Sequence, residues 1–459
     1  MHAQLRRGLR MSALALACAL ALPAVASGAS KREDALEKRV SELEHQVQAL
    51  MDQIKAQREA PPVVVQAPPP PPPPAEPKKE TPAFTTAPGM SVAFHGFVDV
   101  TAFSQNKSFT YGNGQNAEFP VVGSKGTLSG VDIRNTRFWL DITGARLNDD
   151  WTGGGRIEMD FFGGFNGTGA YSLSQPTPRL RQAYLDLSRA DSGTKVRVGQ
   201  QWDLMFPIDN IPTSLSHLAF PLGYGTGVIG WRYPGVVMMQ DLNHGAEGTK
   251  WRLDVGAFEG SWNNQGTAVN HLTAGNPDFR PQLEARIRAE GSNWLAYAAA
   301  HYADIDLKGV DGAAATPVKS GVKSTGVEIG GSWKPGAWNL KGLVYTGKGL
   351  GPIFGAMSQF GDIQETGGFF QVGYNFTKNW SVNAFFASAK PDSGDVLAWA
   401  GNGASGLLRN RQTALNLHYA SGPYQLGLEF LHDTLKSIAG DTTKETSGNQ
   451  IAVSAMYTF

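Results

Sequence analysis

The sequence predicts an all-β protein, a 16-stranded antiparallel transmembrane β-barrel preceded by an N-terminal coiled-coil helix and a Pro-rich linker. The first observation behind this prediction is the C-terminal segment 450–459, in which an apolar and a more polar face alternate up to the final Phe459. The second is that alternating segments recur from Ser91 onward. The third is that short and long connections alternate between these segments, which is typical of outer-membrane barrels.

Composition supports this fold class and argues against several others. The 40 basic and 40 acidic residues balance, whereas phosphate binding needs a basic excess, so we expect no nucleic-acid partner. Beyond the N-terminus no apolar run reaches the roughly 18 residues of a transmembrane helix, and barrel strands leave no such run. The single cysteine, Cys18, lies in a segment that we expect to be removed, which excludes thiol catalysis and a cysteine metal site. We expect no metal and no cofactor.

Residues 1–26 have the order of a secretory signal peptide. Three arginines precede the apolar run Met11–Leu22, and the small residues Ala24–Ala26 follow it. We expect cleavage after Ala26 and export to the bacterial envelope.

Residues 31–59 predict a short periplasmic coiled coil. Their apolar residues step by four and three positions with polar residues between, which is a heptad seam and too narrow a stripe for a helix docked on a domain. Val or Ile alternating with Leu favours dimers, whereas Arg39–Glu44 resembles a motif of short trimeric coiled coils, so the seam alone leaves dimer and trimer open. The residues expected at the contact are Leu36, Arg39, Val40, Leu43, Glu44, Val47, Leu50 and Ile54.

Residues 60–90 form the Pro-rich linker, with an uninterrupted run at Pro68–Pro74. Such a segment adopts an extended polyproline conformation or stays disordered, and the sequence leaves both open. As a stiff periplasmic tether it would also suit binding to peptidoglycan.

Residues 91–459 predict the barrel. Seven short and eight long connections join sixteen strands, an even number with both chain ends on the periplasmic side. The short turns, rich in Gly, Asn, Asp and Pro, are Gly144–Asp150, Ala190–Thr194, Asp241–Gly248, Gly291–Asn293, Lys334–Ala337, Thr377–Asn379 and Ala420–Pro423. The long loops lie near 104–130, 164–178, 204–229, 261–279, 305–323, 349–364, 390–408 and 435–448.

Alternation within single segments indicates which side chains line the lumen. In residues 155–161 and 280–290, apolar positions alternate with Arg, Glu, Asp and Gln. Charges on the lipid face cost roughly 2–4 kcal/mol at membrane depth, so these must face a wet interior. Aromatic residues next to the short turns predict an interfacial girdle: Trp151, Trp294, Trp333, Trp338, Tyr374, Phe376 and Trp380.

The third long connection, residues 202–231, is apolar and does not alternate. A loop that points into water has little use for Leu215, Leu218, Phe220 and Leu222, so we expect it to fold into the lumen and constrict it. A cap or a contact between subunits is the alternative. The expected constriction residues are Pro212, Thr213, Ser214, Ser216 and His217.

Two stretches carry a family resemblance. Arg181–Leu187 followed by Val196–Gln200 resembles the fourth and fifth strands of general porins. The whole layout is similar to the DcaP-type dicarboxylate porins, most specifically in Ile211–Gly235. The resemblance implies homotrimers in the outer membrane of a Gram-negative bacterium that admit small dicarboxylates. A strand that ends on aromatic-x-Phe459 also resembles the signature of barrels inserted by the barrel-assembly machinery.

Arginines are the expected selectivity residues, because guanidinium groups favour anions and bind carboxylates in a bidentate fork. Strict alternation turns Arg181 outward, whereas the porin pattern places it inside. Arg409 and Arg411 also alternate outward and could bind lipopolysaccharide phosphates. Because acids line the same wall, a structural ion pair and solute contact stay equally open for each candidate: Arg137, Arg156, Arg181, Arg197, Arg286 and Arg288.

Three alternatives to a dicarboxylate porin stay open. The nearest is a non-selective general porin. A barrel that tethers the cell wall would use residues 31–88, and an outer-membrane hydrolase would need a nucleophile beside a base, for which His217 with Ser214 and Ser216 is the one local hint. We expect the protein not to be an enzyme.

Overall fold

The computed structural model divides into two units, Met1–Lys78 and Lys79–Phe459. It describes residues 41–42, 45–46, 48–49, 52, 83–87, 89–110, 114, 118–165, 174–259, 263–264, 267–268, 280–306 and 321–459. In the first unit the described residues are helical. The signal peptide, the eight seam residues and the proline run Pro68–Pro74 lie outside the described residues, so these expectations stay predictions.

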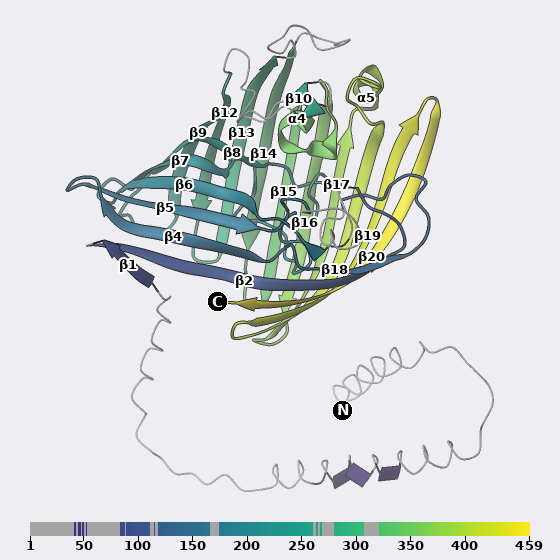
Figure 1. The fold of residues 1–459 in the computed structure, drawn as a ribbon, viewed down its shortest axis with the longest axis horizontal. Coiled ribbons are helices and arrows are strands. Elements are labelled where there is room, and N and C mark those ends of the chain that lie inside the picture. Colours follow the sequence, from purple (N-terminus) through teal and green to yellow (C-terminus); the bar gives the residue numbers. More distant parts are fainter. Residues whose placement is uncertain are drawn as a thin grey trace, which may run out of the picture. The chain divides into compact units, whose positions relative to one another are not determined.

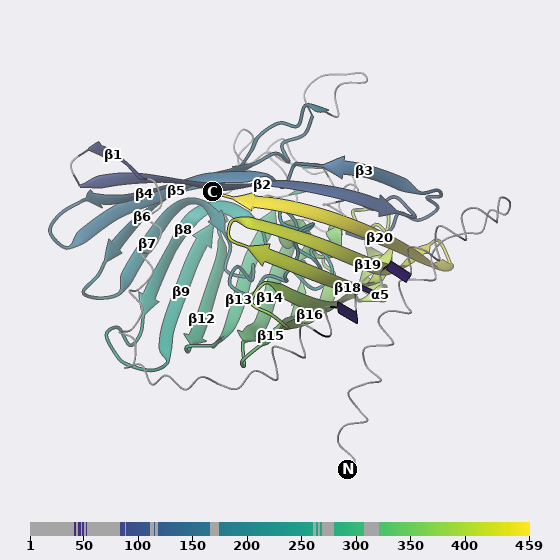
Figure 2. The same cartoon turned by 90° about the horizontal axis from the view of Figure 1, so that it is seen from below.

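The second unit is a closed antiparallel barrel of sixteen strands (Figures 1 and 2). Each strand pairs with the next, and pairing of the first with the last, from Phe97 with Thr458 to Gln105 with Gln450, closes the wall. The strands are β2 (Met90–Gln105), β4 (Arg137–Arg146), β5 (Trp151–Asp160), β6 (Arg179–Arg189), β7 (Thr194–Trp202), β8 (Arg232–Asp241), β9 (Lys250–Phe258), β12 (Gln282–Glu290), β13 (Trp294–Asp306), β14 (Gly321–Trp333), β15 (Trp338–Lys348), β16 (Gln364–Asn375), β17 (Trp380–Pro391), β18 (Leu407–Ser421), β19 (Tyr424–Ala439) and β20 (Thr442–Thr458).

Four further strands are short. β1 (Ala83–Ala87) pairs only with the start of β2, while β10 (Asn263–Asn264) and β11 (Thr267–Ala268) form a separate hairpin. β3 (Leu128–Asp132) continues the line of β4, because β2 pairs with β4 along its first half and with β3 along its second. The break between β3 and β4, residues 133–136, lets Asn135 reach the constriction described below.

The connections follow the predicted alternation with one exception. All seven short turns are confirmed, but the predicted long loop at 435–448 is wrong. β19 and β20 are joined by a two-residue turn, Gly440–Asp441, in which Gly440 has φ +57°. Residues 442–445 within the predicted loop are all polar, yet they pair in register with β19, Glu445 opposite Lys436. Polar residues on both faces of this part of β20 hide the alternation from which strands are predicted.

The wall has the predicted faces. Along β20, Ile451, Val453 and Tyr457 are exposed on the outer surface, whereas Gln450 and Ser454 are buried inside. Along β12 and β5 the charged residues likewise turn inward. The C-terminal residue is fixed by backbone hydrogen bonds between Phe459 and Gly96. Among the described helices, none is long and apolar enough to cross a membrane.

Part of the lumen is filled rather than open. Two long connections carry short helices, α4 (Gly351–Phe354) with the 3-10 turn η3 (Ala356–Ser358), and α5 (Ser393–Ala398), at one end of the barrel (Figure 1). Their buried side chains join an apolar cluster with inward residues of β9 and β13–β19 and with the loop between β7 and β8. A cavity of about 530 Å³ lies instead against β4–β7, where the wall is charged.

Candidate functional site

The connection between β7 and β8, residues 203–231, crosses the lumen as predicted. Its hydrogen bonds reach wall strands on the far side of the barrel: Asn210 Nδ2 to the Gly342 carbonyl (2.8 Å), Thr213 N to Gln371 Oε1 (2.7 Å), and Gly223 N to Gln412 Oε1 (2.7 Å). On the near side, Asn135 Nδ2 donates to the Ser216 carbonyl (3.1 Å). We call residues 203–231 the constriction loop.

Backbone geometry lets the constriction loop approach the wall closely. Gly227 has φ +102°, a conformation that side-chain-bearing residues rarely adopt, and a Cβ there would collide with the Gly368 carbonyl oxygen on β16. The loop is therefore seated against the sheet at a point where only glycine fits.

Glu429 on β19 is the main anchor of the expected constriction residues. Its carboxylate accepts hydrogen bonds from Ser214 Oγ (2.7 Å) and Ser216 Oγ (2.6 Å) and contacts His217 Nδ1 (2.8 Å). Thr213 is held separately by Gln371 and by Asn416 Nδ2, which donates to its carbonyl (2.8 Å). Lys341 Nζ on β15 also donates to Thr213 Oγ1 (3.3 Å), so the Pro-Thr-Ser stretch is fixed to four wall strands.

The Ser–His pair does not have the geometry of a hydrolase. In a catalytic triad the base uses one ring nitrogen for the acid and the other for the nucleophile. Here Glu429 and Ser216 Oγ (3.3 Å) both contact Nδ1 of His217, and Nε2 is buried without a hydrogen-bond partner among the described residues. Ser214 and Ser216 are also buried, so the cluster is an anchor for the loop.

The neck of the loop is held by two buried carboxylates. Asp203 accepts hydrogen bonds from the backbone N–H groups of Met205 (3.0 Å), Phe206 (2.7 Å) and Trp231, and Glu284 accepts one from Leu204 N (2.6 Å). Burial and the charge of Glu284 raise the pKa of the Asp203 carboxyl, and the three N–H donors oppose that rise.

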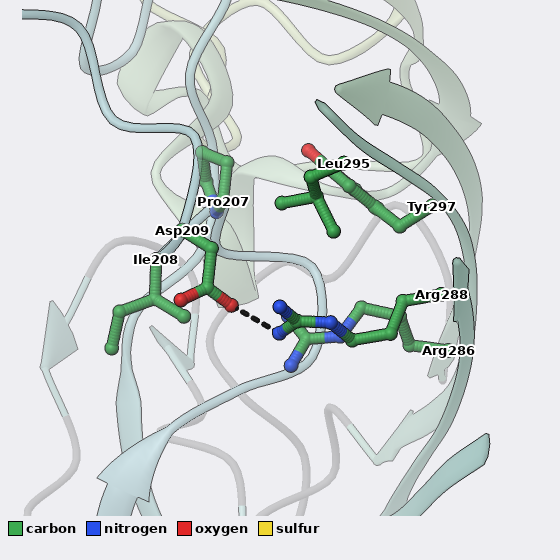
Figure 3. A pocket seen from close by; sticks show the side chains of 7 residues that line it. All are labelled: Pro207, Ile208, Asp209, Arg286, Arg288, Leu295 and Tyr297. Atoms are coloured by element: carbon green, nitrogen blue, oxygen red, sulfur yellow. Dashed lines mark hydrogen bonds and ion pairs between the residues drawn. The ribbon is translucent and has the colours of Figure 1, made fainter. Parts of the chain in front are cut away.

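Arg286 and Arg288, two of the expected selectivity residues, are engaged in the wall and the loop. Arg286 Nη2 lies 3.0 Å from Asp254 Oδ2. Arg288 pairs with Asp209 of the constriction loop (Figure 3). Its Nη2 also lies 2.6 Å from Glu290 Oε2. The cavity between them and Tyr297 measures about 10 Å³, roughly the space of one water molecule. Their positions fit a structural tether better than solute contact.

Arg156 and Arg197 line an open part of the lumen but carry their own counter-charges. Arg156 makes two hydrogen bonds to Asp141 (2.7 and 2.8 Å), and Arg197 makes two to Asp186 (2.7 and 2.8 Å). Their cavity, which Tyr184 also lines, measures about 530 Å³. Such bidentate pairs leave little net charge for a solute.

Arg181 faces inward, and the reason is a β-bulge. The pairing of β5 with β6 shifts between Glu158 and Met159, so that Arg181 is the extra residue on β6. Both Arg181 and Gln182 then turn inward, while Leu180 remains outside. A bulge re-aims a side chain in this way. Arg181 Nε lies 2.5 Å from Glu158 Oε1, and Nη1 lies 2.7 Å from Asp160 Oδ2.

Arg137, the remaining candidate, lies between the wall and the constriction loop. Its Nη2 donates to the Leu218 carbonyl of the loop (2.9 Å), and its Nε lies 3.9 Å from Glu158 Oε1. Nε is buried and has no hydrogen-bond partner among the described residues. Of the six expected arginines, Arg137 and Arg181 therefore meet at one place.

Three further arginines, which the sequence reasoning missed, lie beside them. Cζ of Arg134 lies over Phe162 (4.5 Å), Cζ of Arg179 lies over Phe162 (5.4 Å) and Phe220 (5.3 Å), and Cζ of Arg232 lies over Trp231 (4.4 Å). The aromatic rings beside Arg179 and Arg232 are in contact, because Phe220 packs on Trp231 with 5.5 Å between the ring centroids. We call the set the arginine–aromatic stack; its members are Arg134, Phe162, Arg179, Phe220, Trp231, Arg232, Trp202 and Arg181.

The stack has an excess of positive charge. Its four arginines and Arg137 make five guanidinium groups, and in the described part of the chain three carboxylates pair with them: Asp132, Glu158 and Asp160. Arg134 binds Asp132, and Arg179 binds Asp160. The stack therefore joins the constriction loop to a cationic stretch of wall.

The missed arginines had weak signals in the sequence. Arg134 lies in the break between β3 and β4, and Arg179 begins β6, so alternation does not apply to them. Arg232 begins β8 on the same alternating face as Val236 and Met238, which are exposed on the outside. The aromatic residues around it were the available signal, since Trp202 and Trp231 bracket the constriction loop.

Two predicted outward arginines lie on the outer face. Arg411 is exposed, and Arg409 Nη2 pairs with Glu445 Oε1 at 3.0 Å. No cluster of His, Cys, Asp and Glu suited to a metal ion occurs within the described ranges.

Comparison with solved structures shows that the chain has the fold of an outer-membrane porin. The outer membrane channel DcaP of Acinetobacter baumannii superposes with a TM-score of 0.62 at 18% identity, over 82% of this chain and 99% of that one. An anion-selective porin from Comamonas acidovorans matches with a TM-score of 0.50 at 14% identity, over 81% of this chain and 100% of that one. OmpF of Salmonella typhi matches with a TM-score of 0.50 at 12% identity, over 82% of this chain and 100% of that one. No protein-family model and no curated protein sequence matches the chain.

Proposed function

We propose that the protein is an outer-membrane porin for passive diffusion of small anionic solutes, dicarboxylates in particular. The observation that carries this proposal is the cationic excess of the arginine–aromatic stack and Arg137 beside a loop fixed across the lumen. A porin needs no reaction, only a constriction whose field matches the permeant ion. Excess guanidinium charge favours anions over cations of the same size.

Dicarboxylates suit this wall because its guanidinium groups come from several strands. Arg134 and Arg179, whose side chains are each 20% exposed, lie beside β4 and at the start of β6, so a solute with two carboxylates can interact with both at once. Guanidinium groups also match carboxylate geometry better than ammonium groups do. The similarity to the DcaP-type layout supports the same class.

The assembly belongs to the proposal as well. The heptad seam of residues 31–59 supports self-association of a periplasmic N-terminal segment, the similarity to the DcaP-type layout supports a homotrimer, and the Pro-rich linker supports contact with peptidoglycan. The exposed apolar outer face, with aromatic residues such as Trp294, Trp333 and Trp338 beside the short turns, supports a lipid environment. Arg409 and Arg411 are the proposed contacts with lipopolysaccharide, and Phe459 the proposed signal for the barrel-assembly machinery.

Uptake by proteoliposomes containing the purified chain tests the permeant class. Succinate, its neutral analogue succinamide and the dication 1,4-diaminobutane have similar sizes, so differences between them report charge selection. The proposal expects succinate to enter fastest and the diamine slowest. Equal rates would reduce the function to general diffusion, and faster entry of the diamine would contradict the proposal.

A further inference from the structure

Arg232 differs from the other arginines of the stack because no carboxylate in the described part of the chain pairs with it. Arg134, Arg179 and Arg181 each bind a carboxylate at 2.5–2.6 Å at their shortest contact. Arg232 makes no ion pair and no hydrogen bond through its side chain to any described residue, and its Nη1 is buried without a partner. Only 5% of the residue is exposed.

Two tryptophans take the place of the missing carboxylate. Cζ of Arg232 lies 4.8 Å from the ring centre of Trp202 and 4.4 Å from that of Trp231, and the two rings meet edge to face. An aromatic ring attracts a cation through its quadrupole, but unlike a carboxylate it adds no negative charge. The positive charge of Arg232 is therefore held in place without a paired carboxylate among the described residues.

Such an arrangement is unfavourable for folding alone. Burying an unpaired charge costs free energy that a carboxylate partner or an apolar side chain in the same position would avoid. The charged groups that act most strongly on Arg232 are Arg181, Arg179, Asp160 and Arg137, all at the constriction wall. Because burial excludes water and counter-ions from around Arg232, its field reaches that wall with less screening than the field of a solvated charge would.

We propose that Arg232 is a specificity-determining residue, which sets the anion preference of the constriction through its charge and not through contact with the solute. This inference rests on the proposed function, since it assumes that the constriction selects anions. The Trp202 and Trp231 rings are positioning residues that keep the guanidinium at the neck of the loop.

Reversal potentials of the purified full-length protein in planar bilayers, under a KCl gradient, test the inference. The variants are R232Q, which removes the charge, R232K, which keeps it, and R189Q, which removes one charge from the end of β6, where Arg189 pairs with Asp191. Loss of a charge near the ion path is expected to lower the chloride-to-potassium permeability ratio about five- to tenfold in R232Q. R232K and R189Q are expected to keep the ratio of the unmodified protein.

Salt dependence separates an electrostatic role from a packing role. The difference between R232Q and the unmodified protein is expected to shrink at high salt, because screening shortens the reach of the charge. If R232Q does not form heat-stable barrels, R232M, whose unbranched side chain fits between the two rings, replaces it with the same expectation.

Two results would overturn the inference while the proposed function stands. One is that the unmodified protein prefers anions and R232Q has the same chloride-to-potassium permeability ratio. The other is an equal loss in R232K and R232Q, which would assign Arg232 a packing role. A lack of anion preference in the unmodified protein would instead refute the proposed function, and the inference would fall with it.

Discussion

Arg181 and Glu158 form a buried ion pair, with 2.5 Å between Nε and Oε1, because a β-bulge turns Arg181 into the lumen. Without the bulge, Arg181 would share the outward face of Ala183 and Leu185. The same bulge brings Gln182 Nε2 within 2.8 Å of Glu158 Oε2. One inserted residue therefore supplies both a cation and an amide to the constriction wall.

Replacing Arg181 with alanine is expected to lower both stability and anion preference. Glu158 would lose its nearest cation, and breaking a buried ion pair by removing one partner costs about 3–5 kcal/mol. The temperature at which the folded barrel unfolds on a denaturing gel should fall, and the chloride preference should weaken. R189A, which removes an arginine from a partly exposed ion pair at the end of β6, is the control. Equal behaviour of the two variants would show that the buried pair is unimportant.

Replacing Glu429 with glutamine is expected to loosen the constriction loop. The amide cannot serve Ser214, Ser216 and His217 as one carboxylate does, and buried hydrogen bonds to a charged group contribute about 1.5–3 kcal/mol each. Single-channel recordings should show larger conductance and more current noise. E445Q removes an acid on the outer face and should leave both unchanged; a quiet channel of ordinary conductance in E429Q would argue against the anchor.

Replacing Gly227 with alanine is expected to displace the constriction loop from β16. The new Cβ would collide with the Gly368 carbonyl oxygen, and φ +102° adds backbone strain. G401A is a matched control, because Gly401 also has positive φ (+77°) but a Cβ added there would meet nothing within 4 Å. Altered conductance in G227A but not in G401A would support the close contact of Gly227 with β16. Identical conductance in both variants would show that this contact does not affect conduction.

Deleting residues 31–59 is expected to weaken the trimer without changing conduction through each barrel. The barrel closes through β2 and β20 and does not include this segment. Native gels should show less trimer after heating, and conductance per subunit should stay the same. A double substitution of Leu43 and Leu50 by aspartate should reproduce the deletion. Unchanged trimer stability in both would refute the heptad seam as an assembly element.

The barrel could be predicted from the sequence because each strand faces lipid on one side and the wet lumen on the other, so apolar and polar residues must alternate. Ile451 and Ile157 are apolar and face outward, whereas Gln450 and Glu158 are polar and face the lumen, so residue type alone predicts the orientation. The prediction was wrong at 442–445, where both faces are polar and alternation has no contrast. It missed Arg232 because burial there depends on Trp202 and Trp231, which come together only when the loop is closed. It left Arg181 ambiguous because a bulge is a property of pairing between strands.

The reversal potential of the unmodified protein under a KCl gradient tests the central claim most directly, namely that the arginine-lined constriction selects anions. The expected result is a potential displaced toward the chloride equilibrium value, with a smaller displacement at high salt because screening weakens the field. A potential displaced toward the potassium value would contradict the claim, since five guanidinium groups facing three carboxylates could not then control the ion path.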